Sequence, residues 1–553
     1  MPTTQATARS SAGRLSKVAA TVAATAVGLA ALTGCTGSDA PTSEISTTSD
    51  AVTTGASTDA SATDGESDST GEPENAKPEI YGFSASPTAI YEPGAVILEL
   101  DASTDVVDVD VWYGATILGT VPAAAFPYSF DVTSQSMCDG PQTFTATVRD
   151  AEGLTATSPP ADLFCQLPAP GSQVYTRTLE GLASANGTAI TLLPDGGILV
   201  AGALDGRMML WRLDAAGDPV AGWPKTIADW TLVEGLDADE SSATAVAVDP
   251  AGKFLVVAGF VKNGIAFRRY VAKLSNEGVL LWEDDGQVDG EEVMGLAVSA
   301  AGDIVTAGSL RTSPLDKPPL YDAVTVGYTG GVKAKRWARV FEKPATDPQL
   351  DDLNLDSERW RGVIALADGG FLVFGERDYS DWENKRFTRT TMAQVSGDNE
   401  LVGETWTSPG SQYANDAALA GTRTDTGFAF TGWCRHKNQG VQQVCIQTFD
   451  DDGKPDQTYV EPWPTQTAGL GVAQDRMKRL VVAGYKSKPG EIDAWIFASI
   501  GAGYPPAWQQ PPVNQGGWDF ATGVVCEAWG KCTWVGSTTI DGNLAVVVSQ
   551  RYP

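Results

Sequence analysis

The stretch AVAVDPAGKFLVVAG, residues 245–259, carries the pattern that decides this fold: an apolar run, a polar turn with Asp and Gly, and a second apolar run that ends on Gly. Such runs around an Asp/Gly turn predict a β-hairpin, because Asp and Gly tolerate positive φ. The closing glycines recur every 49 to 67 residues. This period predicts a repeat architecture of the propeller kind. Six further copies read AITLLPDGGILVAG (189–202), GLAVSAAGDIVTAG (295–308), VIALADGGFLVFG (363–375), ALAGTRTDTGFAFTG (418–432), GVAQDRMKRLVVAG (471–484) and GVVCEAWGKCTWVG (523–536).

Each hairpin is followed by signs of two more strands. A third apolar run follows the closing glycine after a polar loop, as in MMLWRL (208–213) and YVAKL (270–274). One tryptophan stands 21 to 31 residues beyond each of the first six closing glycines, and we expect it to mark a fourth strand or its margin. These tryptophans are Trp223, Trp282, Trp337, Trp406, Trp463 and Trp508.

The last copy has room for only three strands, because 17 residues follow Gly536. The segment SQVYTRTL (172–179) precedes the first copy and has no partner in its own repeat. If it joins the last copy, every sheet has four strands and no inner edge is left bare. We therefore predict an all-β chain in which residues 170–553 form a seven-bladed β-propeller closed by the strand at 172–179.

The repeats resemble the bacterial β-propeller repeats of the SBBP and delta-60 kind, which carry a similar "DGkilvaG" core.

Residues 78–166 are predicted to form a separate β unit, because apolar and polar residues alternate at 107–111 and 144–148. Its segments VWYGATILGTV (111–121), FPYSFDV (126–132) and GPQTFTATVRDAEGLTATS (140–158) resemble those of bacterial immunoglobulin-like domains. That resemblance implies a β-sandwich that acts as a spacer or an adhesive module.

The first 35 residues resemble a bacterial lipoprotein signal. Arg9, Arg14 and Lys17 precede an uncharged apolar stretch that ends in Leu-Thr-Gly-Cys at Cys35. A cleaved signal peptide with a chance cysteine is the alternative. On the lipoprotein interpretation Cys35 carries the acyl chains, so the protein has a membrane partner. Thr36 stands where an inner-membrane lipoprotein would have Asp, which favours the outer membrane, on its periplasmic or its surface side.

Residues 36–77 are rich in Ser, Thr, Asp and Glu and have no aromatic residue, which predicts a disordered tether.

Six cysteines remain besides Cys35, and an even number of cysteines fits an oxidising compartment. They fall into three local pairs. The predicted disulfides are Cys138–Cys165, Cys434–Cys445 and Cys526–Cys532. No CxxC spacing occurs and the chain has one histidine, so no metal or other cofactor is predicted.

The net charge of −31 makes nucleic acid a poor partner. We expect a ligand site on the long loops between second and third strands, which emerge on one face with the crossings between sheets. The expected ligand is a protein or a glycan. The alternative interpretation is that these residues are ordinary solvated charges on surface loops. The predicted ligand-binding residues are Arg311, Arg377, Tyr379, Trp382, Arg435, His436 and Lys486.

Catalysis has little support in the sequence. There is no G-x-S-x-G elbow, and HExxH zinc chemistry needs two histidines. The run Asp450-Asp451-Asp452-Gly453 fits a calcium loop only loosely. The first strands are expected to begin with Ala245, Gly295 and Val363, which predicts a bland central wall. We therefore expect a noncatalytic binding protein, with a propeller-type hydrolase or a quinone- or sugar-dependent oxidoreductase as the alternative.

Overall fold

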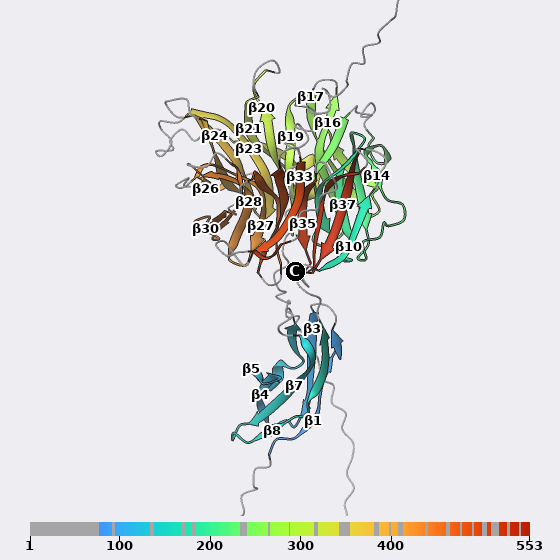
Figure 1. Ribbon diagram of the computed structural model, residues 1–553, viewed down its shortest axis with the longest axis vertical. Helices are drawn as coiled ribbons and strands as arrows, with labels where there is room; N and C mark the ends of the chain where they lie inside the picture. Colours follow the sequence, from blue (N-terminus) through green and yellow to red (C-terminus); the bar gives the residue numbers. More distant parts are fainter. Residues whose placement is uncertain are drawn as a thin grey trace, which may run out of the picture. The chain divides into compact units, whose positions relative to one another are not determined.

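The computed structural model describes residues 77–552 with several gaps, the longest at 342–353, and divides at residue 168 into two compact units. The described residues form strands and short 3₁₀ helices (Figure 1). None of them belongs to a helix with the length and hydropathy of a membrane span. The predicted signal with Cys35, and the tether up to residue 76, lie outside the described residues.

The N-terminal unit contains two sheets that share one core. β3 contributes Val96 and Leu98, and these cluster with Val109, Val111 and Phe144 of the other sheet. A disulfide joins Cys138 and Cys165. One sheet has the order β1 (Ile80–Ser86), β3 (Gly94–Ala102), β6 (Tyr128–Val132). The other has the order β2 (Ala89–Ile90), β9 (Ala161–Gln166), β7 (Asp139–Asp150), β4 (Val106–Tyr113), β5 (Thr116–Pro122), with β8 (Thr155–Thr157) also on β7.

The second unit, here called the seven-sheet unit, contains seven four-stranded antiparallel sheets among its described residues. Six of them are built from consecutive strands. The first sheet is β11 (Ala185–Leu192), β12 (Ile198–Leu204), β13 (Arg207–Leu213) and β14 (Lys225–Thr226); the second is β15 (Glu240–Val248), β16 (Phe254–Asn263), β17 (Ala266–Ser275) and β18 (Leu280–Asp284); the third is β19 (Glu291–Val298), β20 (Ile304–Arg311), β21 (Tyr321–Tyr328) and β22 (Arg336–Val340). The fourth sheet is β23 (Asn354–Ala365), β24 (Phe371–Ser380), β25 (Arg386–Val395) and β26 (Leu401–Thr407); the fifth is β27 (Tyr413–Thr424), β28 (Gly427–His436), β29 (Gln443–Phe449) and β30 (Pro455–Val460); the sixth is β31 (Thr467–Gln474), β32 (Leu480–Lys488), β33 (Glu491–Ser499) and β34 (Pro506–Gln509).

The seventh sheet combines strands from both ends of this unit. β35 (Phe520–Cys526), β36 (Cys532–Ile540) and β37 (Asn543–Arg551) are followed by β10 (Gln173–Leu179), the segment that had no partner in its own repeat. β10 runs antiparallel to β37, with Thr176 opposite Ser549. The two hydroxyl oxygens of this pair lie 2.8 Å apart. Figure 1 shows the two strands side by side.

The first strands of successive sheets contact one another, and β35 of the seventh sheet contacts β11 of the first. Threonine hydroxyls reinforce three of these junctions. Thr188 donates to the carbonyl of Ala243 at 2.6 Å and Thr244 to that of Val293 at 2.7 Å. Thr522 donates to the carbonyl of Gly187 at 2.8 Å, which links the seventh sheet to the first.

Every first strand has a β-bulge opposite the closing glycine of its repeat, and the register shifts there by one residue in all seven sheets. A bulge bends its strand and increases the local twist. A Cβ on Gly259 would overlap the carbonyl oxygen of Ser242. A Cβ on any of the other six closing glycines would overlap the equivalent carbonyl oxygen of the first strand in its own sheet. The repeat therefore ends on glycine because the bulge leaves no room for a side chain.

Three first strands begin earlier in the sequence than predicted. β15, β19 and β23 begin at Glu240, Glu291 and Asn354, several residues before Ala245, Gly295 and Val363. Near two of these starts polar side chains bond to the neighbouring sheet: Ser241 accepts the backbone N–H of Met208 at 2.8 Å, and Glu291 pairs with Arg269 at 2.9 Å.

The predicted fourth-strand tryptophans fit the sheets where they are described. Trp282, Trp337, Trp406 and Trp508 lie in β18, β22, β26 and β34. Trp223 lies two residues before β14, and Trp463 is outside the described residues. Asp450 caps the turn between β29 and β30 by accepting the backbone N–H of Lys454 at 2.7 Å.

Candidate functional site

The predicted ligand-binding residues lie at corresponding ends of the second strands in the third to sixth sheets. Arg311 ends β20, Arg377 and Tyr379 lie in β24, Arg435 and His436 end β28, and Lys486 lies in β32. Trp382 lies outside the described residues. The sheets thus bring these segments to the same end of the seven-sheet unit, which we call the rim end.

Their surroundings differ. Arg377 is buried and forms an ion pair with Glu358 of the adjacent strand, which suits a contact between β23 and β24. Burial raises the pKa of Glu358, although Arg377 acts in the opposite direction. Arg311 is half-buried and donates to the carbonyl oxygens of Ser313 at 3.2 Å and Pro314 at 2.9 Å. Arg435 and Lys486 are also half-buried.

A cluster of charges that was not predicted lies beside Arg311, between the third and fourth sheets. Arg361 is the bulge residue of β23, and its Nε lies 3.1 Å from Oε1 of Glu376. The Nη1 of Arg359 reaches the same oxygen at 3.3 Å. The guanidinium carbon of Arg359 also lies 4.2 Å from the ring centre of Tyr321, within cation–π range. We call Glu292, Arg359, Arg361, Glu376 and Tyr321 the charged cluster.

The pKa values of the two carboxyl groups in the charged cluster are shifted in opposite directions. Burial by itself would raise the pKa of Glu376, but Arg361 and Arg359 lower it below its ordinary value. Burial raises the pKa of Glu292, and the more distant charges of Arg361, Arg359 and Arg311 only partly offset it. Among the described residues, no cation lies within ion-pair distance of Glu292. Burial likewise raises the pKa of the Tyr321 hydroxyl, and the charge of Glu292 adds to that shift.

Comparison of the seven sheets shows that these charges are not common to all of them. One cross-strand pair stands immediately beyond the closing glycine, on its rim side, in every sheet; we call these pairs the rim row. Its charged members are Glu292 of the third sheet and the Arg359–Glu376 pair of the fourth. The other pairs are Asn186–Ala203, Ser242–Phe260, Ala417–Trp433, Ala468–Tyr485 and Phe520–Ser537.

The rim row changes to aromatic residues in the fifth to seventh sheets. Trp433, Tyr485 and Phe520 are half-buried and pack against a cluster that includes the bulge residues Leu419 and Leu470. The rings of Tyr485 and Phe520 meet edge to face with centres 5.7 Å apart. The rim row therefore presents charged groups from two sheets and aromatic rings from the next three.

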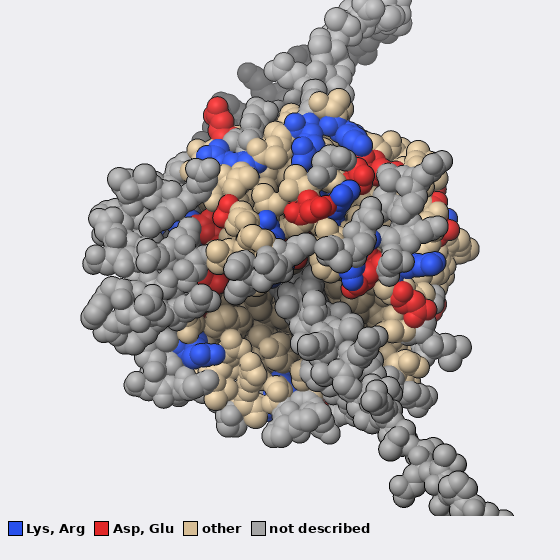
Figure 2. All heavy atoms as spheres, turned by 90° about the horizontal axis from the view of Figure 1, so that it is seen from above, with Lys and Arg blue, Asp and Glu red and all other residues tan. Residues whose placement is uncertain are grey.

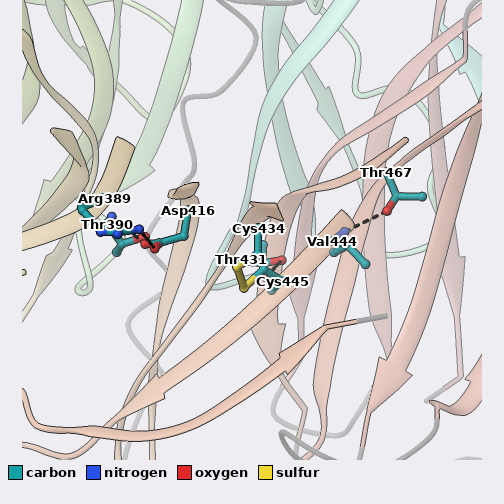
Figure 3. Close-up of a disulfide and its surroundings, with 8 residues drawn as sticks. All are labelled: Arg389, Thr390, Asp416, Thr431, Cys434, Val444, Cys445 and Thr467. Atoms are coloured by element: carbon teal, nitrogen blue, oxygen red, sulfur yellow. Dashed lines mark hydrogen bonds and ion pairs between the residues drawn. A yellow bond between two sulfur atoms is a disulfide. The ribbon is translucent and has the colours of Figure 1, made fainter. Parts of the chain in front are cut away.

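The fifth sheet is held to its neighbours by polar contacts that Figure 3 shows. Asp416 of β27 accepts the backbone N–H of Thr390 at 2.8 Å and lies 3.4 Å from Nη1 of Arg389. Thr467 of β31 accepts the backbone N–H of Val444 at 2.8 Å, close to the Cys434–Cys445 disulfide. Asp416 and Thr467 occupy the same place, three residues before the bulge of their strands. These contacts fix β27 and β31, which pair with the strands that carry Trp433 and Tyr485.

A second buried charge network has a structural explanation. Arg269 of β17 is 1% exposed and reaches Glu291 at 2.9 Å and Asp284 at 3.1 Å. It also donates to the Tyr328 hydroxyl at 2.7 Å. Because these partners belong to the second and third sheets, the network joins the two sheets and leaves its charges inaccessible.

The opposite end of the fourth and fifth sheets has a small cavity, lined by Leu366, Leu372, Phe428 and Asp451 among others. Its one cationic side chain, Arg423, is paired with Asp451 at 2.6 Å. Arg423 is therefore already engaged by a carboxylate, and Asp368 adds a second acidic side chain to the lining.

Figure 2 views the molecule from above relative to Figure 1, and basic and acidic side chains lie interspersed on that face. Because the described charges on that face are of both signs, recognition there depends on short-range contacts. Among the described residues, no group of three His, Cys, Asp or Glu could hold a metal ion. The charged cluster offers guanidinium donors, a carboxylate and a phenol, which suit a polar or anionic ligand.

The charged cluster could have been found from the sequence by aligning the seven copies on their closing glycines. Arg359 and Arg361 precede the fourth apolar run, and Glu376 immediately follows its closing glycine. The repeated segments quoted above begin at their apolar runs, so Arg359 and Arg361 lie before the fourth segment and Glu376 lies after it. Tyr321 had no such signal, because only the fold brings its strand beside Arg359.

No protein-family model matches the chain, and no curated protein matches it. Solved structures with a similar course of the chain include a protein of unknown function from Dyadobacter fermentans DSM 18053, which is 14% identical over 70% of this chain and 100% of its own, with a TM-score of 0.38. A polysaccharide lyase described as an ulvan lyase is 9% identical over 67% of this chain and 95% of its own, with a TM-score of 0.41. Prolyl oligopeptidase B from Galerina marginata is 12% identical over 67% of this chain and 48% of its own, with a TM-score of 0.36. Likeness at this level gives no information on activity.

Proposed function

We propose that this chain is an exported bacterial lipoprotein whose seven-sheet unit is a closed seven-bladed β-propeller that binds a ligand at its rim end without catalysing a reaction. The N-terminal unit would be an immunoglobulin-like β-sandwich that acts as a spacer. Support for the ring comes from the pairing of β10 with β37 and from the Thr522–Gly187 hydrogen bond. Support for an exported protein comes from three disulfides and from the lipobox at Cys35.

The observation that carries the binding role is the confinement of rim-row charges to the third and fourth sheets. The other five sheets have the same bulge and the same closing glycine without such charges. Half-buried charges cost stability when they are desolvated, so a fold that does without them elsewhere has no structural need of them here. Ligand recognition is the role that gives them a use.

The binding role can be tested with the full chain purified in detergent. Envelope extracts and a glycan array are probed with the wild type, with Arg359→Gln, and with Arg207→Gln as a matched control. Arg207 is exposed on β13 of the first sheet and outside the rim row. The proposal expects a captured ligand that Arg359→Gln loses and Arg207→Gln keeps. Identical capture by all three proteins would contradict it.

The same samples address the enzymatic alternative. Glu292 has a raised pKa and lies near the Tyr321 hydroxyl, an arrangement that a general acid would also have. Saturable hydrolysis by the wild type that Glu292→Gln abolishes would replace the binding role by an enzymatic one.

The lipid anchor is a separate part of the proposal. Acylation of Cys35 would place the protein at the outer membrane, on its periplasmic or its surface side. Mass spectrometry of the mature protein should find an acylated N-terminal cysteine, and Cys35→Ser should release the protein from the membrane fraction. An unmodified terminus at another residue would exclude the anchor.

A further inference from the structure

We infer that the rim row recognises an acidic polysaccharide, with sugar carboxylates bound by Arg359 and sugar rings stacked on Trp433 and Tyr485. This inference rests on the proposed binding role and specifies the chemical class of the ligand. It follows from the donors that remain on Arg359, from the state of Glu292, and from the aromatic rings in the neighbouring sheets.

Arg359 is the cation of the charged cluster that can reach a ligand. Its side chain is 24% exposed, whereas that of Arg361 is 10% exposed. The two arginines share one carboxylate, because both bind Oε1 of Glu376. A guanidinium has five N–H donors in a planar fork that matches a carboxylate. Among the described residues, Arg359 uses its donors on Glu376 alone, with its guanidinium carbon 4.2 Å from the ring centre of Tyr321, so donors remain for an anionic group.

Glu292 adds a group that a polyhydroxylated ligand can use. It lies in the neighbouring strand β19, and burial raises its pKa. A protonated carboxyl both donates and accepts hydrogen bonds, and an ionised one accepts them. Sugar hydroxyls need both kinds of partner. A carboxyl that takes up a proton readily also lowers the repulsion that an acidic ligand would meet.

The aromatic side of the rim row supplies surfaces for sugar rings. Trp433 and Tyr485 are half-buried and are backed by Leu419 and Leu470, which hold the rings in place. The C–H groups on one face of a sugar ring pack on an aromatic face, while the hydroxyls at the edge stay free for polar contacts. Because the row repeats from sheet to sheet, it suits a ligand that itself consists of repeated units.

The ligand must be bound locally, because the whole chain carries a net charge of −31 and repels polyanions at long range. At about 0.15 M salt this repulsion is screened beyond about 8 Å. Short-range contacts to Arg359 then decide the affinity.

The experiment measures binding of polygalacturonate fragments to the full chain in detergent at that salt concentration, by calorimetry or polarisation. Neutral galactan fragments of the same length and polyglutamate are the comparison probes. The proteins are the wild type, Arg359→Gln, Trp433→Leu and the control Arg207→Gln, each checked for an unchanged melting temperature. We expect polygalacturonate to bind more tightly than either comparison probe. Arg359→Gln should weaken it about tenfold, as the loss of one charge-assisted hydrogen bond does, and Arg207→Gln should leave it unchanged.

Three results would overturn the inference. Equal binding of galactan would remove the role of the carboxylate, equal binding of polyglutamate would remove that of the sugar, and no binding of polygalacturonate would remove both. If polygalacturonate fails but Arg359→Gln still abolishes capture of another envelope ligand, only the ligand class is wrong. If Arg359→Gln changes no capture at all, the proposed function fails as well.

Discussion

The closing glycine of each repeat is required at the residue scale by the bulge opposite to it. In the second sheet a Cβ on Gly259 would overlap the Ser242 carbonyl oxygen, which belongs to backbone and cannot move aside cheaply. We expect Gly259→Ala to lower the free energy of unfolding by about 1–3 kcal/mol, the usual range for overpacking. Urea denaturation measures this. Gly82→Ala is the control, since its Cβ would meet only Asp101 at an ordinary 3.8 Å; equal effects of the two substitutions would contradict the bulge explanation.

The raised pKa of Glu292 predicts how the stability of the protein depends on pH. Its folded-state pKa is raised by burial, so the stability associated with its protonated form is fully present below its ordinary value of 4.5 and is lost as the pH rises through the raised value. Glu292→Gln cannot ionise and should therefore melt at a higher temperature than the wild type at pH 8. Below pH 4 the difference should shrink. Calorimetry at the two pH values tests this, and a variant that is less stable at pH 8 would show that the charge of Glu292 is favourable.

The first strands decide the junctions between sheets at the element scale. Their bulge residues are Thr188, Thr244 and Thr522 in the first, second and seventh sheets, and each hydroxyl bonds to the backbone of a neighbouring sheet. The third to sixth sheets have Met294, Arg361, Leu419 and Leu470 there instead. The first strands thus use small hydroxyls at this position in the first, second and seventh sheets, and charged or apolar side chains in the third to sixth, where the candidate site lies.

Thr522→Val tests one such junction. Valine keeps the shape of the side chain but cannot donate to the carbonyl of Gly187, which is then left buried without this partner. We expect a loss of about 1–2 kcal/mol in the free energy of unfolding. Thr458→Val on the exposed strand β30 should change it little. If both variants unfold at the same denaturant concentration as the wild type, the hydroxyl does not strengthen the junction.

At the scale of the whole seven-sheet unit, strand β10 comes from the N-terminal end and completes the last sheet. Without β10, strand β37 would be an edge with unpaired N–H and C=O groups. We expect a chain that starts at residue 182 to melt at a lower temperature than one that starts at residue 169 and to self-associate. Calorimetry and size-exclusion chromatography compare the two. A monomer with an unchanged melting temperature would show that β10 is dispensable.

The extent of prediction from sequence can be followed in particular elements. The hairpins, the partner of β10 and the three cysteine pairs were predicted, because turn residues, strand counting and local cysteine spacing are visible along the chain. The beginnings of β15, β19 and β23 were misplaced, since polar residues interrupt the apolar pattern there; Ser241 and Glu291, for example, bond to the preceding sheet. Arg311 was predicted for the site, whereas Arg359, its neighbour across the sheets, was not.

Repeated hairpins with seven closing glycines follow from the order of the amino acids, because strand and turn preferences act between neighbours along the chain. The surroundings of a given charge follow from the folded arrangement instead. It buries Arg377 against Glu358, stacks Arg359 on Tyr321, and leaves Glu292 beside three arginines without an ion pair among the described residues. These partners come from strands that are distant in sequence, and burial and proximity, which set the electrostatics, exist only once the sheets have assembled.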